Sequence, residues 1–95
     1  MGQELNRERV DSARLAVSRF YELSTARKVP AKEVIAYGRQ SGLRRAEIKA
    51  ARRLLGVRSV KENGGYWWEW PEGIDPGEMN RQISREVLGH AGKGD

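Results

Sequence analysis

Apolar residues recur at intervals of three and four along the first quarter of the chain, with charged residues between them. The apolar positions are Val10, Ala13, Val17, Phe20 and Tyr21. Because an α-helix has about 3.6 residues per turn, this spacing places them on one face, which is typical of a helix packed against a core. The pattern therefore predicts a first helix from about Glu4 to Ala26.

A second helix is predicted from about Pro30 to Gln40, with apolar contacts from Val34 and Ile35. Proline suits the start of a helix because its missing N–H would have no partner there. Gly38, near the other end, lowers helix propensity by about 1 kcal/mol relative to alanine. A glycine at this place therefore indicates that another helix crosses closely over it.

A tight turn and a third helix follow. Gly42 supplies the positive φ that such a turn needs. The third helix is predicted to begin at Arg44 or Arg45 and to run to Leu55, where Gly56 provides a C-terminal cap. Two helices joined by a tight turn form a helix-turn-helix motif.

The third helix has an apolar face and a basic face. Three residues share the apolar face, which predicts burial, namely Ile48, Ala51 and Leu55. The opposite face carries Ala46, Lys49, Ala50 and Arg53, flanked by Arg45 and Arg52. Small alanines among the cations would let this helix approach the edges of DNA bases, where arginine can bond guanine O6 and N7.

Two strands are predicted over 57–62 and 66–70, because both segments are rich in β-branched and aromatic residues. Asn63-Gly64 between them is a strong signal for a tight hairpin turn. A basic second helix of the motif followed by a hairpin is the plan of a winged helix. The predicted fold is therefore α+β, a winged helix-turn-helix with a three-helix core, a two-stranded β-hairpin wing and a short C-terminal helix.

The alternation of a strand sorts the aromatic residues of the hairpin onto two faces. Tyr66, Trp68 and Trp70 share one face, and Trp68 and Trp70 are expected to pack on the helices. Trp67 lies on the opposite face and is expected to be half exposed. Three roles stay open for it: contact with a DNA sugar, cover of a partner protein, or shielding of a core edge.

A short helix is predicted from about 76 to 88. Asp75 would be its N-cap, and Glu78 follows three residues later, as in a capping box. Its apolar stripe consists of Met79, Ile83 and Val87. The glycine-rich end of the chain, 89–95, is expected to be disordered.

The chain of 95 residues is long enough for one domain with a small core. We assign 1–71 to the winged-helix domain and 72–95 to an acidic tail that contains the short helix. The absence of cysteine and the single His90 exclude a disulfide and offer no metal site or cofactor site. The scattered carboxylates do not assemble a nucleophile, a base and an orienting group, so an enzyme is not predicted.

No apolar run approaches the roughly 18 residues that span a bilayer, and the polar amino terminus lacks the apolar core of a signal peptide. A cytoplasmic protein without a membrane partner is therefore expected. The net charge of +5 is unevenly distributed. Residues 25–61 carry eleven basic and two acidic residues, whereas 62–95 carry three basic and seven acidic ones. A concentrated basic block indicates a polyanionic partner, since each neutralised phosphate releases counterions.

Duplex DNA is the predicted partner, and the predicted contact residues come from the third helix and the hairpin. They are Arg44, Arg45, Ala46, Lys49, Ala50, Arg52, Arg53, Arg58, Lys61 and Asn63. Of these, Arg45, Lys49 and Arg53 would lie near base edges, whereas Arg52, Arg58 and Lys61 would hold phosphates. A solvated basic face without a partner is the plainer alternative.

Residues 12–71 resemble a known module, the winged-helix domain that ends many primase–helicase proteins of the RepA-like ATPase type in phages, plasmids and integrative elements. The resemblance rests on the segment from Ser41 to Val57, which ends in Leu-Gly-Val. It continues through Gly64-Gly65 and through the tryptophan-containing strand from Tyr66 to Pro71. It implies DNA contact at Arg45, Lys49, Arg53 and the hairpin.

The chain departs from that family in two respects. Arg44 stands where the family usually has a serine-like helix cap, and no Walker motif is present, so no catalytic role carries over. Two related functions stay open: a part in mobile-element replication, next to an ATPase or primase portion, and a small transcriptional regulator. A third, from another class, is a protein-interaction or self-dimerising winged helix that uses Trp67 and the acidic tail helix. RNA binding by the hairpin aromatics ranks below duplex DNA.

Overall fold

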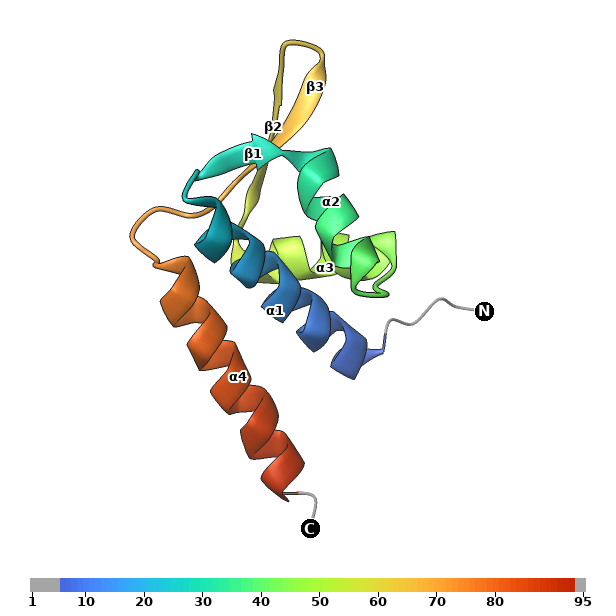
Figure 1. Ribbon diagram of the computed structural model, residues 1–95, viewed down its shortest axis with the longest axis vertical. Helices are drawn as coiled ribbons and strands as arrows, with labels where there is room; N and C mark the ends of the chain where they lie inside the picture. The colour runs from blue at the N-terminus through green and yellow to red at the C-terminus, as the bar shows by residue number, and fades with distance from the viewer. Residues whose placement is uncertain (1–5, 94–95) are drawn as a thin grey trace.

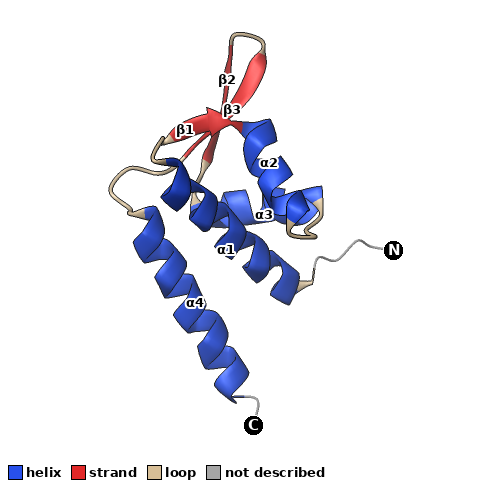
Figure 2. Ribbon diagram, in the orientation of Figure 1, coloured by secondary structure: helices blue, strands red, loops and turns tan. Residues whose placement is uncertain are grey.

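The computed structural model describes residues 6–93, which form four α-helices and one three-stranded antiparallel sheet (Figure 1). The predicted α+β class is confirmed, and helices and strands are interspersed along the chain in the order α-β-α-α-β-β-α (Figure 2). The elements are α1 (Arg7–Ser24), β1 (Lys28–Pro30), α2 (Ala31–Gln40), α3 (Arg45–Leu55), β2 (Arg58–Glu62), β3 (Gly65–Glu69) and α4 (Pro76–Lys93).

The first helix, α1, is slightly shorter than the predicted 4–26. It begins after Asn6, whose side-chain Oδ1 accepts the backbone N–H groups of Glu8 at 2.8 Å and Arg9 at 3.2 Å. It ends at Thr25, which adopts a left-handed conformation with φ of 65°. Both ends are therefore set by local capping, which an apolar period does not reveal.

The sheet contains a strand that the sequence did not predict. β1 pairs antiparallel with β3, and Val29 lies opposite Trp68. The strand order is therefore β1-β3-β2, and the sheet has three strands instead of the predicted two. Three residues are too few to show an alternating pattern. Pro30, predicted as the first residue of α2, is instead the last residue of β1 and occupies the N-cap position of the helix. β1 is an edge strand, and an edge strand tolerates proline.

The hairpin turn is confirmed. Asn63 and Gly64 have φ values of 50° and 78°, which a two-residue turn between twisted strands requires, and Glu62 pairs with Gly65. The strands run from Arg58 to Glu62 and from Gly65 to Glu69, within about a residue of the predicted bounds. In Figure 1 the hairpin extends past β1, so its tip stands away from the helices.

The core lies between the helices and one face of the sheet. Trp68 and Trp70 are buried in it, as predicted, together with residues of all four helices. Two polar contacts accompany this burial: the Trp70 indole donates to the Ile74 carbonyl at 2.7 Å, and the Tyr21 hydroxyl donates to the Trp68 carbonyl at 2.6 Å. Tyr66 shares the face of Trp68 but is 59% exposed, because it lies beyond the core near the hairpin tip.

The helix crossing predicted from Gly38 is confirmed. A Cβ atom at this position would lie 2.7 Å from Cδ1 of Ile48, which is closer than atoms in contact can approach. Ile48 is fully buried and has no room to withdraw. The turn that follows is also as predicted, since Gly42 has a φ of 86°.

The last helix, α4, is longer than predicted and is part of the packed body. Its Ile83 is fully buried and lies in the same hydrophobic core as residues of α1, alongside which α4 runs in Figure 1. The Asn80 side chain donates to the Leu15 carbonyl at 2.9 Å and to the Ser18 hydroxyl at 2.8 Å.

Both signals that predicted α4 are confirmed. The Asp75 carboxylate accepts the N–H of Glu78 at 2.9 Å, and Met79 and Val87 pack beside Ile83. The predicted end at about 88 is wrong, because the helix continues to Lys93, and 94–95 lie outside the described residues. Once several turns are docked on α1, each further residue adds a backbone hydrogen bond at small entropic cost. None of the helices within 6–93 combines the length and the apolar character needed to cross a membrane.

Candidate nucleic-acid interface

Helix α3 turns one side to the core and the other to solvent. Ile48, Ala51 and Leu55 are buried, as the spacing predicted. The outer side presents Arg45, Ala46, Lys49 and Arg53 as exposed residues, with Ala50 half-buried among them. The structure therefore brings the predicted base-contacting residues together on one accessible surface, which we call the α3 face.

The cations of the α3 face are not neutralised by the protein. Within 6–93, none of Arg44, Arg45, Lys49 and Arg53 forms an ion pair with a carboxylate. Elsewhere in the same segment, Arg9, Arg14, Arg27 and Arg58 are all paired. Four cations without a carboxylate partner in the described chain thus lie on or beside the accessible side of α3, and this cluster favours an anionic partner.

A buried carboxylate that was not among the predicted site residues fixes the start of α3. Glu47 is only 3% exposed, and its two oxygens accept the Arg9 Nε–H at 2.7 Å and the backbone N–H of Arg44 at 2.8 Å. Arg9 also donates to the carbonyl of Gly42 at 2.6 Å. One pair of side chains therefore ties α1 to the turn and to the first residues of α3.

This arrangement also settles where α3 begins. The helix begins at Arg45, and Glu47, its third residue, caps the N–H of Arg44 in place of a serine-like cap. A glutamate at the third helical position was the signal that could have revealed it. The consequence is that the Arg44 side chain is not needed for capping and stays exposed beside the α3 face.

We expect Glu47 to make stability depend on acid pH. The hydrogen bond from Arg9, together with that from the Arg44 amide, holds the pKa of Glu47 below its usual value. A carboxyl with a lowered pKa stabilises the folded state above its unfolded pKa of about 4.3, and this contribution is lost as the pH falls through the folded pKa. In urea unfolding at several pH values, Glu47→Gln should be less stable than wild type at neutral pH, and the gap should close in acid.

Glu33→Gln provides a matched control for that measurement. Glu33 is also the third residue of its helix, α2, but it is exposed and has no arginine partner within 6–93. Its substitution should shift stability by no more than about 0.5 kcal/mol at any pH. A pH-independent gap for Glu47→Gln would show that the charge of Glu47 does not contribute.

Two of the predicted phosphate contacts are engaged within the protein. Arg52 donates to the Val57 carbonyl at 2.7 Å, its guanidinium lies 5.4 Å from the ring centre of Trp68, and burial lowers its pKa. Arg58 is exposed but donates to Glu69 at 2.7 Å. Lys61 has no ion pair within the described chain and lies 5.7 Å from the Tyr66 ring centre.

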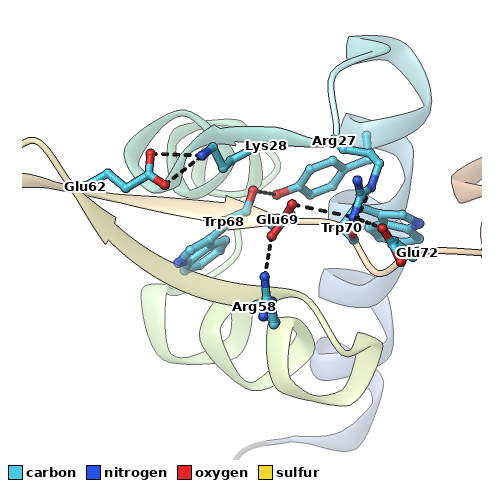
Figure 3. A network of polar contacts seen from close by, with 9 residues as sticks. Arg27, Lys28, Arg58, Glu62, Trp68, Glu69, Trp70 and Glu72 are labelled. Atoms are coloured by element: carbon cyan, nitrogen blue, oxygen red, sulfur yellow. Dashed lines mark hydrogen bonds and ion pairs between the residues drawn. The ribbon is translucent and has the colours of Figure 1, made fainter.

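The outer face of the sheet carries a network of compensating charges (Figure 3). Glu69 lies between Arg58, at 2.7 Å, and Arg27, at 3.5 Å. Beside it, Lys28 donates to both carboxylate oxygens of Glu62 at 2.9 Å. The close-up shows two separate groups, the Lys28–Glu62 pair and the cluster around Glu69, so the charged side chains in both groups lie next to opposite charges.

The α3 face and the hairpin tip meet at a groove of about 420 Å³, which we call the Trp67 groove. Arg45 reaches it from α3 and Asn63 from the hairpin turn, with Trp67 between them in the wall. The structure thus brings Arg45 of α3 close to the hairpin, where Asn63 is a predicted contact residue and Trp67 is the aromatic residue whose role the sequence left open. No three histidine, cysteine, aspartate or glutamate residues within the described part of the chain gather closely enough to hold a metal ion.

Comparisons of this chain with protein-family models, with curated proteins and with solved structures gave no match. The resemblance to the primase–helicase winged helix therefore stays a prediction.

Proposed function

We propose that this protein is a winged-helix DNA-binding module that binds duplex DNA through α3 and the hairpin. The observation that carries the proposal is the α3 face, where Arg45, Lys49 and Arg53 are exposed without carboxylate partners in the described chain. Alanines lie between them, so the helix backbone can come close to a second surface. Helix α2, the turn at Gly42 and α3 form the helix-turn-helix, and β2 and β3 form the wing.

The spacing of the cations suits a helix that lies in the major groove. They recur every four residues, so successive side chains are about 6 Å apart along the helix axis. Arginine in this position can donate two hydrogen bonds to guanine O6 and N7, and lysine can contact bases or phosphates. Lys61 and Asn63 would bring the wing against the sugar–phosphate backbone, which positions the helix without reading sequence.

The engaged arginines have a separate part in this proposal. Arg52 connects the end of α3 to the start of β2 and so supports the angle between the helix and the wing, whereas Arg58 joins β2 to β3 through Glu69. Phosphate contacts would then come from Arg44, Lys49 and Lys61. The resemblance places such a module in a mobile-element protein, as part of a replication apparatus or as a small transcriptional regulator.

A binding measurement at several salt concentrations tests the proposal. Labelled random-sequence duplex DNA, single-stranded DNA and duplex RNA are titrated with the protein, and fluorescence anisotropy gives each affinity. We expect the blunt duplex DNA to bind more tightly than either the single-stranded DNA or the duplex RNA. The logarithm of its affinity should fall with the logarithm of salt with a slope of about −3 to −5, since each phosphate contact contributes about −0.9. Absence of duplex binding at low salt would refute the proposal.

A further inference from the structure

The Trp67 groove lies between the hairpin and the start of α2. Its wall is mainly apolar and includes Pro30, Ile35 and Trp67. Its volume of about 420 Å³ lies within the range of about 300–1,000 Å³ that is typical of small-molecule pockets. The groove is therefore large enough to take up a flat ring system rather than a single side-chain methyl group.

Trp67 supplies an aromatic surface that the core does not use. It lies on the sheet face opposite the buried Trp68 and is only half-buried. The Lys28 ammonium lies 6.0 Å from its ring centre, so this cation approaches the ring from the β1 side. The remaining indole surface faces the groove, where a planar partner can stack on it.

The charges around the groove favour a nucleotide over a neutral apolar group. Glu62, the one acidic residue in the wall, is neutralised by two hydrogen bonds from Lys28 at 2.9 Å. Lys32 and Arg45 also line the groove, are exposed, and have no carboxylate partner within 6–93. A base would therefore meet apolar and aromatic surface, while its phosphates would meet cations that the protein leaves unneutralised.

The groove is continuous with the α3 face because Arg45 belongs to both. We propose that the Trp67 groove binds an unstacked nucleobase of a strand that leaves the duplex, so that the protein recognises a junction between double-stranded and single-stranded DNA. This inference rests on the proposed duplex binding and names the form of DNA that fits best. An apolar side chain of a partner protein is the competing occupant, and the experiment below separates the two.

Three DNA molecules with the same duplex test the inference by anisotropy: one blunt, one with a short single-stranded adenine overhang, and one with an overhang of abasic nucleotides. The abasic overhang carries the same phosphates but no base. We expect the adenine overhang to raise affinity at least about fivefold over the blunt duplex. That gain corresponds to about 1 kcal/mol, the lower end of what one base stacked on an aromatic side chain contributes. The abasic overhang should give less than half of this gain.

Two variants assign the gain to Trp67. Trp67→Leu keeps an apolar side chain but cannot stack, so it should lose the gain from the adenine overhang and keep the blunt-duplex affinity. Trp67→Phe keeps an aromatic ring and should retain part of the gain. Unchanged blunt-duplex affinity also shows that each variant is folded.

Each outcome bears on one proposal or on both. Equal affinity for the three DNA molecules overturns the junction inference, as does a gain that persists with the abasic overhang or in Trp67→Leu. If the blunt duplex binds with the expected salt dependence, duplex binding stands even when the junction inference fails. If none of the DNA molecules binds at low salt, both proposals fail and a protein partner takes the groove.

Discussion

Reversing the charges of Arg45, Lys49 and Arg53 together to glutamate is expected to lower the affinity for duplex DNA by at least about 1,000-fold. Each cation that contacts a base or phosphate contributes about 1–3 kcal/mol, so three contacts contribute about 3–9 kcal/mol, and each glutamate adds repulsion from the phosphates. A loss of about 1,000-fold corresponds to about 4 kcal/mol. The side chains are exposed and make no ion pair within 6–93, so the fold should tolerate the changes. Anisotropy titration gives the affinity, and far-ultraviolet circular dichroism verifies the helices.

Two double variants distinguish the effect of where the positive charge lies from the effect of the total net charge. Arg45→Glu with Lys49→Glu, and Arg81→Glu with Arg85→Glu, lower the net charge equally, but Arg81 and Arg85 are exposed on α4. The α3 pair should lose at least about tenfold more affinity than the α4 pair. An equal loss in both would mean that the protein attracts DNA only through its overall charge, and the α3 face would lose its special role.

Replacing Ile83 by alanine is expected to lower the free energy of unfolding by about 2–5 kcal/mol. Ile83 is fully buried against the core, and the shortened side chain would leave a cavity between α4 and α1. A domain of this size is stable by only about 5–15 kcal/mol, so the loss is a large fraction of the total. Urea unfolding followed by circular dichroism measures it, and the transition should remain a single cooperative step.

Leu88→Ala is the control for that variant. Leu88 lies on the same helix but is 69% exposed, so its truncation should change stability by less than about 0.5 kcal/mol. A similarly small effect at Ile83, or a separate transition for α4, would support the predicted division at 71 between a domain and a tail. Because Ile83 lies in the same core as residues of α1, we expect one cooperative unit that includes α4.

Features with a local signal were predictable from the sequence. Gly38 indicated the helix crossing because a glycine inside a helix lowers helix propensity and so calls for a reason. The reason is the side chain of Ile48, which occupies the space that a Cβ atom at this position would need. Asn63-Gly64 specified the turn because few residues accept positive φ at two consecutive positions. The two-sided character of α3 followed from its period, which placed the candidate contact residues on one face before any tertiary contact was known.

Features that depend on distant partners were not predictable. β1 owes its strand conformation to pairing with β3, because three residues carry no period of their own. Arg9 and Glu47 are 38 residues apart, and no local pattern selects this arginine from the others in the chain. Arg52 was predicted to hold a phosphate from its place on the flank of the basic face, whereas its contacts with Val57 and Trp68 depend on the fold.

The order of the strands has a consequence for how the chain folds. β3 is the last strand in sequence but the central one in the sheet. Its pairing with β2 closes a two-residue turn, an event of about 1–10 μs. Its pairing with β1 and the hydrogen bond from Tyr21 of α1 are long-range contacts, and the latter joins residues 47 apart. The hairpin can therefore form early by itself, whereas pairing of β1 with β3 closes a loop that contains α2 and α3. We expect this closure to be the slower step in folding.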